Sequence, residues 1–254
     1  MSDGIIARLR STLEKPTDFS EVVAGSWGSL DARELAGRRV SLQGGSIVAL
    51  GELFEITGQA GGQIRFRGDL SRAHRLGAGL SEGTVVVEGD IGDEVGIGMS
   101  AGSIEVQGSA GDRAGGAALE ARRGMTGGEL VIRGKAGSDA GSRMRRGTLA
   151  IGGDAGSHAG VGTIAGTIVV FGDAGASPGL WSKRGSIVAL GSVAIPSTYQ
   201  YACIYRPTVL PLLLGRLRTR YGLPVEDRHV SGSYRRYSGD LADLGKGEIL
   251  AWTA

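Results

Sequence analysis

The sequence predicts an all-β protein in which the chain winds into a parallel β-solenoid, and three observations support this fold class. A unit of nineteen residues repeats at a fixed period, most plainly over 147–191. The five residues after each opening glycine alternate between apolar and mixed positions, which is typical of a half-buried strand. Glycine accounts for 47 of the 254 residues, as expected if every repeat turns several tight corners.

Eight copies of the unit can be aligned on their opening glycines. Neighbouring copies start 17 to 26 residues apart, and the widest spacing reflects an insertion of seven residues around 120–126. A fixed period of this length identifies a repeat architecture. We therefore expect about eight coils of ~19 residues each, by the repeat-period argument. They open at Gly45, Gly62, Gly83, Gly102, Gly128, Gly147, Gly166 and Gly185.

Each copy predicts one strand with its second and fourth residues facing inward. All sixteen of these residues are apolar, whereas the positions between them include Arg65, Glu105 and Arg133. A helix would need apolar spacings of three and four instead. Strands of stacked coils pair in parallel, about 4.8 Å apart. The predicted inward pairs are Ile47/Ala49, Ile64/Phe66, Val85/Val87, Ile104/Val106, Leu130/Ile132, Leu149/Ile151, Ile168/Val170 and Ile187/Ala189.

Four aspartates follow a glycine at the predicted corners: Asp69, Asp90, Asp154 and Asp173. An aspartate in such a turn accepts a hydrogen bond from the backbone two residues further on, so we expect Asx turns here. Calcium binding is the alternative. Calcium-binding solenoids, however, use tandem nine-residue repeats, which this sequence lacks.

The 1–44 segment precedes the repeats and is predicted to be an N-terminal cap. The end of a solenoid exposes apolar side chains and strand edges, which a cap would cover. Residues 5–13 fit a short helix or strand, and Asp31 is placed to cap a helical turn that ends at Gly37. The glycine-rich repeats then form a second region, 45–195.

Residues 196–254 lose the glycine period and predict a helix-containing tail that packs on the repeats. Thr208 is placed to cap the helix, Pro211 falls in its first turn, where proline is tolerated, and Gly222 ends it. From 235 onward the pattern fits a returning, strand-rich segment. The apolar face of the helix comprises Leu210, Leu213, Leu214 and Leu217.

Composition argues against several partners and compartments. The formal net charge is +2 and aromatic residues make up 5% of the chain, so a basic or base-stacking surface for nucleic acid is not expected. The single cysteine, Cys203, excludes an internal disulfide framework and fits a reducing compartment. The first residues lack the apolar core of a signal peptide, and no stretch approaches the ~18–20 apolar residues of a membrane span. We expect a cytoplasmic protein.

Basic residues recur in the turns before glycines, as at 122–123, 145–146 and 183–184. Because equivalent positions of a solenoid stack, these residues predict a basic stripe. The stripe fits either a solvated corner or protein contact, or a surface that binds a polycarboxylate or phosphate through guanidinium groups. The candidate anion-binding residues are Arg122, Arg123, Arg145, Arg146 and Arg184.

No catalytic or metal-ligating residue is predicted. His74 and His158 fall in turns of different copies, and His229 lies in the tail. Neither the histidines nor Cys203 have the spacing of a zinc site. The serines lie beside glycines in turns and show no Ser-His-Asp arrangement.

The tail narrows the resemblance that the coils suggest. The Gly-(Ser/Thr) coils resemble the glycine-rich β-helix domain of glutamate synthase. With the tail added, the chain is similar over nearly its full length to the C subunits of formylmethanofuran dehydrogenases, and closest to the C subunit of the bacterial formyltransferase/hydrolase complex. The tail motifs are Tyr199-x-x-x-Cys203-x-Tyr205-Arg206-Pro207 and Ser238-Gly239-Asp240 followed by Gly245-Lys246-Gly247-Glu248-Ile249.

This resemblance implies a right-handed parallel β-helix without chemistry of its own, which packs against the A and B subunits near D. The complex would serve one-carbon metabolism in methylotrophy. It would transfer formyl from formyl-tetrahydromethanopterin to a methanofuran-type carrier and release formate, with the A and D subunits performing the reactions. The carrier has an anionic, glutamate-rich tail, which makes it a candidate ligand of the five arginines. No cofactor is expected on this subunit itself.

Three alternatives stay open. The first is the C subunit of a tungsten or molybdenum formylmethanofuran dehydrogenase, because the C subunit discriminates poorly between the two branches, although a single cysteine supplies no ligand set for iron–sulfur clusters. A stand-alone β-helix enzyme, such as a polysaccharide lyase, would need acidic and basic residues that converge on one sheet face. A left-handed acyltransferase helix has a period of eighteen, from which copies at nineteen drift out of register.

Overall fold

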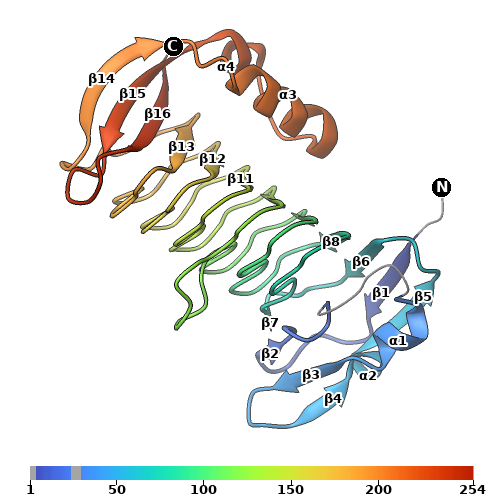
Figure 1. Ribbon diagram of the computed structural model, residues 1–254. Helices are drawn as coiled ribbons and strands as arrows, with labels where there is room; N and C mark the ends of the chain where they lie inside the picture. The colour runs from blue at the N-terminus through green and yellow to red at the C-terminus, as the bar shows by residue number, and fades with distance from the viewer. Residues whose placement is uncertain (1–3, 24–29, 254) are drawn as a thin grey trace.

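The computed structural model of the chain describes residues 4–23 and 30–253. The protein is mainly β and elongated, with stacked turns of chain between two end regions (Figure 1). The blue N-terminal region lies at one end and the red C-terminal region at the other. Part of the predicted cap, residues 1–3 and 24–29, lies outside the described residues.

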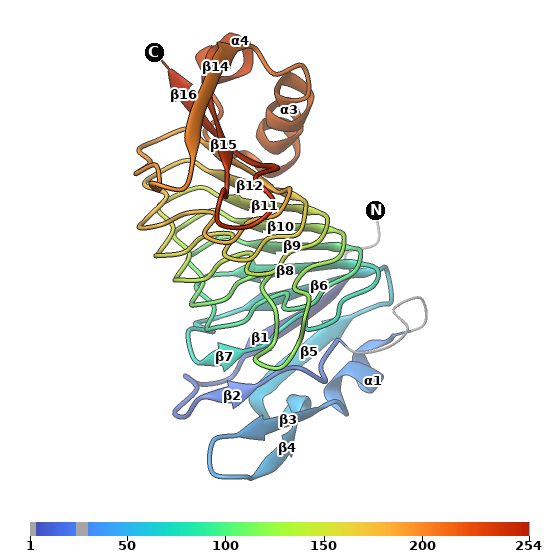
Figure 2. The ribbon, with the colours of Figure 1, turned by 60° about the vertical axis from the view of Figure 1, so that its left-hand side comes forward.

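One sheet of twelve strands runs the length of the molecule. Seven of its strands come from the predicted repeats and pair in parallel in chain order, with equivalent residues opposite one another, such as Leu130 and Leu149. The strands predicted from Gly62 onward are therefore confirmed (Figure 2). They are β6 (Gln63–Arg67), β8 (Thr84–Glu88), β9 (Ser103–Val106), β10 (Glu129–Ile132), β11 (Thr148–Ile151), β12 (Thr167–Val170) and β13 (Ser186–Ala189).

The copy that opens at Gly45 does not join this sheet, so the prediction of an eighth coil is wrong. Its strand, β4 (Ile47–Ala49), pairs antiparallel with β3 (Arg39–Leu42) in a separate four-stranded sheet. The predicted inward residue Ile47 is 53% exposed. The physical reason is that the edge of β6 is already paired with β1 (Ile5–Leu9), which runs parallel to it.

The small sheet also contains β2 (Thr17–Asp18) and β7 (Ala73–His74), in the order β4-β3-β2-β7. Two short helices, α1 (Ala32–Ala36) and α2 (Leu50–Leu53), lie mainly against β5 (Phe54–Gly58) of the large sheet. As predicted, Asp31 caps α1 and Gly37 ends it, and Glu34 completes a capping box.

Strands outside the repeats extend the large sheet at both ends. At the N-terminal end, β5 (Phe54–Gly58) pairs antiparallel with β1. At the other end, β16 (Gly247–Thr253) continues the parallel ladder from β13, and β15 (Ser233–Gly239) and β14 (Gln200–Tyr205) follow antiparallel. Of the helix or strand predicted within 5–13, the structure has the strand, and the strand-rich tail is confirmed.

The main core fills the interior of the stacked turns. Of the sixteen residues predicted to face inward, the fourteen from Ile64 to Ala189 are all buried. In β10 to β13 the residue between each inward pair is also apolar and fully buried, so these four strands are covered on both faces.

A second core lies outside these strands, under α3 (Leu210–Tyr221). Its buried residues Leu210, Leu214 and Leu217 pack with Val169 and Val188 of the sheet, so the helix covers one flank of the stack (Figures 1 and 2). The short helix α4 (Asp227–Ser231) follows.

The ends of α3 match the sequence prediction in part. Pro211 lies in the first turn, and Gly222 ends the helix in the left-handed conformation with φ 64°. The predicted cap at Thr208 is wrong, because Val209 is the N-cap residue and makes no side-chain bond. A backbone bond from Leu210 N to Pro207 O, 3.3 Å long, closes the turn before the helix instead.

Candidate functional site

The five arginines predicted to form a stripe do not stack in one column. Backbone hydrogen bonds between successive turns show that Arg145, Ile164 and Lys183 occupy equivalent positions in three consecutive turns. By the same register, Arg146, Ala165 and Arg184 occupy the next position along each of these turns. Ile164 and Ala165 therefore separate the Arg145–Arg146 pair from the Lys183–Arg184 pair.

Arg122 and Arg123 belong to a different part of the surface. The glycine that opens their coil is Gly128, which has φ +80° at the start of β10, and not Gly124. Gly124 N instead donates to Arg143 O at 2.9 Å. The two arginines therefore lie in the insertion, which projects as a green loop from the side of the stack (Figures 1 and 2).

The guanidinium groups of these five arginines make no hydrogen bond or ion pair within residues 4–23 and 30–253. Four of the side chains are exposed, and Arg145 is half-buried. The charge is therefore available to an external anion or an acidic surface. Whether a carrier tail binds there stays a prediction.

A shallow groove lies beside these arginines, between the insertion and the later turns. Its walls include Leu119 of the insertion, Arg143, Val161 and Trp181. Leu119 is 83% exposed and Trp181 is 58% exposed. The groove therefore combines apolar side chains with Arg113, Arg143 and the carboxylate of Asp139, a combination that the sequence analysis did not single out.

Carboxylates at another corner are engaged in bonds within the chain. Glu94 accepts from Arg75 Nε at 2.8 Å and from Arg113 Nε at 2.9 Å, which links three successive turns. Burial opposes ionisation of Asp18, but hydrogen bonds from Ser20 and the Arg75 guanidinium outweigh it and hold the pKa of Asp18 below its ordinary value. The hydrogen bond to Glu94 raises the pKa of Arg75. This ladder joins turns of the stack to one another.

The corner aspartates behave in two ways. Asp69 and Asp173 accept the backbone N–H two residues on, from Ser71 at 2.9 Å and from Gly175 at 2.6 Å, as predicted. For Asp90 the predicted Asx turn is wrong. It accepts from Ser109 N at 2.7 Å in the next turn of the stack.

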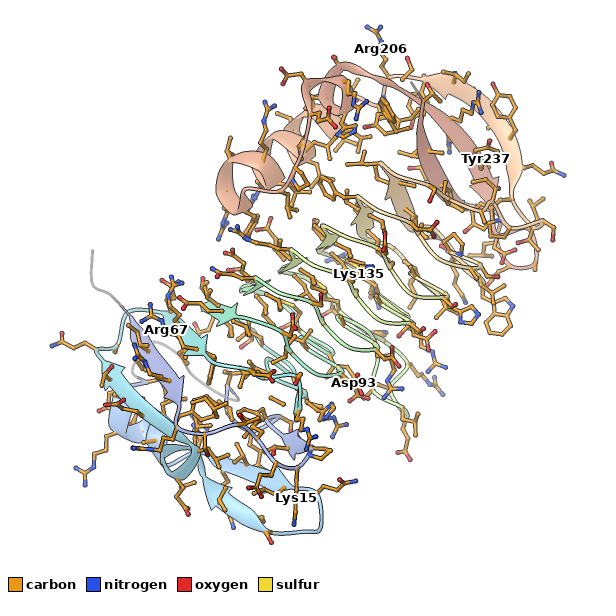
Figure 3. All side chains as sticks on the ribbon, turned by 180° about the vertical axis from the view of Figure 1, so that it is seen from behind. Lys15, Arg67, Asp93, Lys135, Arg206 and Tyr237 are labelled. Carbon is orange, nitrogen blue, oxygen red and sulfur yellow. The ribbon has the colours of Figure 1, made fainter. Side chains whose placement is uncertain are left out.

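Asp154 departs from the prediction in the same way and accepts from Asp173 N at 3.0 Å. The cause is the stacking itself, which places the next turn's N–H within reach of the carboxylate. Asp93 forms the same kind of bond with Asp112 N at 2.9 Å, and its side chain lies along a corner of the stack in Figure 3. The backbone bond from Asp173, with the Lys135 side chain, lowers the pKa of Asp154.

The three histidines lie in separate surroundings. His74 Nδ1 accepts from Asp93 N at 3.0 Å, and His158 lies 3.5 Å from Asp139. His229 packs edge-on against Trp252, and burial lowers its pKa. Over residues 4–23 and 30–253, no three His, Cys, Asp or Glu side chains gather into a metal-binding group.

The half-buried carboxylate of Glu129 and the buried carboxylate of Asp240 have partners that the sequence analysis did not predict. Glu129 accepts a hydrogen bond from the Tyr221 hydroxyl at 2.6 Å and forms an ion pair with the Arg216 guanidinium at 2.9 Å, and so joins β10 to α3. Burial, with the Glu129 carboxylate, raises the pKa of Tyr221. The side chain of Asp240, which is 0% exposed, accepts hydrogen bonds from Trp181 N at 2.8 Å and from Ala242 N at 2.9 Å. No local sequence signal marks these long-range partners.

No helix among the described residues is long and apolar enough to cross a membrane. No protein-family model matches the chain, and no curated protein matches it.

A solved structure does match along the whole chain. It is the crystal structure of the formyltransferase/hydrolase complex (FhcABCD) from Methylorubrum extorquens in complex with methylofuran, in which one chain is 36% identical in sequence with a TM-score of 0.78. The alignment covers 98% of this protein and 100% of that chain. Identity at this level over both full lengths reflects common descent. The chain therefore belongs to the family of formyltransferase/hydrolase complex subunits.

Proposed function

We propose that this protein is the C subunit of a formyltransferase/hydrolase complex and serves there as a structural subunit without catalytic residues. The observation that carries the proposal is the full-length match, at 36% identity, to a chain of such a complex. We further propose that the repeats form a right-handed parallel β-helix. The in-register parallel pairing from β6 to β13 supports this fold assignment.

The use of the charged side chains supports a structural role. Glu94 bridges two arginines, Glu129 holds α3, and the corner aspartates accept backbone N–H groups of neighbouring turns. These carboxylates are committed to hydrogen bonds that hold the stack together. General acid–base work needs a carboxylate within reach of a substrate proton.

In the proposed complex, other subunits transfer formyl from formyl-tetrahydromethanopterin to a methanofuran-type carrier and release formate. The related complex was crystallised with methylofuran. This chain, cytoplasmic in the proposal, would hold the A, B and D subunits in place as part of the hetero-oligomer.

The test is co-expression of the chain with the A, B and D subunits from the same cell, with an affinity tag on another subunit. We expect the chain to be retained in stoichiometric amount and the complex to release formate from the formyl donor. The purified chain alone should show no turnover. Formate release by the isolated chain, or absence of the chain from the purified complex, would contradict the proposal.

A further inference from the structure

One corner of the stack has a left-handed backbone in five turns. Gly79, Gly98 and Gly162 adopt it with φ of +66°, +65° and +63°. Arg143 and Trp181 occupy the equivalent corner in other turns, with φ of 52° and 58°. A side chain is disfavoured there because its Cβ approaches the following carbonyl oxygen. Glycine is therefore the unstrained choice, and two turns depart from it.

The side chains at these two positions are largely exposed. Trp181 leaves 58% of its surface in water, so most of its ring is available for contact with a partner. Arg143 is exposed and donates one hydrogen bond, to Ala121 O of the insertion at 2.9 Å. Both side chains line the groove that Leu119 closes on its other side. Left-handed backbone also recurs at non-glycine residues of the corner four residues earlier, among them Glu94, Arg113 and Asp139. The feature that marks the groove is therefore the exposure of two large apolar side chains, Leu119 and Trp181.

Two arginines of the insertion lie beside this apolar centre. Arg122 and Arg123 fall between Ala121, whose carbonyl accepts from the Arg143 guanidinium, and Gly124, whose N–H donates to Arg143 O. Both arginines are exposed, and neither has an ion-pair partner within residues 4–23 and 30–253. Two carboxylates lie nearby, Glu120 in the insertion and Asp139, which lines the groove. We name the set Leu119, Arg122, Arg123, Arg143 and Trp181 the insertion–corner surface.

We infer that the insertion–corner surface docks an acidic surface of another protein subunit, with Trp181 and Leu119 as its apolar anchors. The inference rests on the proposed function, because the partner is a subunit of the same complex. Tryptophan and arginine are the residues most enriched among those that dominate binding energy at protein interfaces. Unpaired arginines around the anchors complement carboxylates on the partner.

A protein partner fits this surface better than an anionic carrier tail. A polyanion would contact the arginines at the rim and leave the Trp181 ring and Leu119 in water. A protein surface can bury Leu119 and the Trp181 ring and, in the same contact, place carboxylates against the surrounding arginines. The carrier is therefore the alternative that the experiment must separate.

The test uses the tagged complex co-expressed with variants of this chain. Trp181→Gly removes one anchor. The relief of the left-handed backbone offsets the lost burial of part of the ring, so the unfolding midpoint of the variant chain should lie close to that of the unsubstituted chain. Its affinity for the other subunits should nevertheless fall tenfold or more. Leu119→Ala should weaken binding in the same direction, whereas Leu212→Ala, a matched change of a leucine that is 79% exposed on α3, should not.

Charge reversal at the rim gives the second measurement. Arg122→Glu with Arg123→Glu should weaken retention tenfold or more at low salt and flatten its dependence on sodium chloride, because exposed charge pairs are screened. If the unsubstituted chain is retained and every variant is retained equally, the inference is wrong and the proposed function stands. If the variants assemble normally but raise KM for the carrier, the surface binds the carrier and the inference is overturned. If the unsubstituted chain is not retained at all, both fail.

Discussion

The second core can be tested by truncating one residue of α3. Leu214 is 0% exposed and packs with Val169 and Val188 on the outer face of the sheet. Replacing a fully buried leucine with alanine removes its contacts and leaves a cavity, which costs about 2–5 kcal/mol in the free energy of unfolding. Helix propensity does not add to this loss, because alanine is at least as favourable as leucine in a helix.

The matched control is Leu212→Ala in the same helix. Leu212 is 79% exposed, so the same chemical change should alter the free energy of unfolding by less than about 0.5 kcal/mol. Urea unfolding of both variants measures the stability of the chain. Amide hydrogen exchange of 210–221 shows whether the helix itself is released from the sheet. Equal effects of the two substitutions, or full protection of α3 amides in Leu214→Ala, would refute the assignment of a second core.

Four further predictions follow from the surroundings of single residues. Glu94→Gln removes the negative charge that pairs with Arg75 and Arg113. Because both arginines are partly exposed, the free energy of unfolding should fall by only about 1–2 kcal/mol, which thermal unfolding at low salt measures. Asp240 is buried, which opposes ionisation, but backbone bonds outweigh this and hold its folded pKa below the ordinary 3.8. Its carboxylate therefore stabilises the fold above about pH 4, and this contribution is lost as pH falls through the folded pKa. In Asp240→Asn, the free energy of unfolding should depend less steeply on pH below about pH 4. Gly147→Ala should destabilise the chain by about 1–3 kcal/mol, because φ is +96° and a Cβ would lie 2.7 Å from Gly128 O. Gly215→Ala, in an open helical position, should stabilise it by about 0.5–1 kcal/mol in the same urea titration.

One heptapeptide marks the limit of what the sequence could predict about the fold. Gly-Ser-Ile-Val-Ala-Leu-Gly occurs at both 45–51 and 185–191. In the second copy it forms β13 of the parallel ladder, with Ile187 3% exposed. In the first copy it forms β4 and the start of α2, with Ile47 53% exposed. Local sequence is identical, so the neighbouring strands decide the outcome.

The periodic part of the fold could be predicted because each inward residue faces its equivalent in the next turn. The flank covered by α3 carried a signal that the analysis did not use. The outward positions Val131, Ala150, Val169 and Val188 are apolar, whereas Arg65 is the equivalent in β6. Apolar residues on both faces of a strand indicate cover on both sides.

The candidate site was predictable in composition but not in arrangement. The arginines are exposed, as expected for corner residues. Their column is interrupted because Ile164 and Ala165 occupy the same corner one turn later. The insertion moves Arg122 and Arg123 away from that corner, and the exposure of Trp181 depends on the left-handed backbone, which sequence periodicity does not encode.

The parallel ladder has a consequence for synthesis on the ribosome. Each repeat from β8 to β13 can dock on the previous rung as soon as it leaves the exit tunnel. The edge of β13 stays unpaired for longer, because Ser186 of this strand pairs with Glu248 of β16, which is synthesised 62 residues later. While residues 190–247 are being synthesised, this open strand edge can pair with strands of other chains. Misassociation with neighbouring nascent chains is therefore most favoured during that part of synthesis.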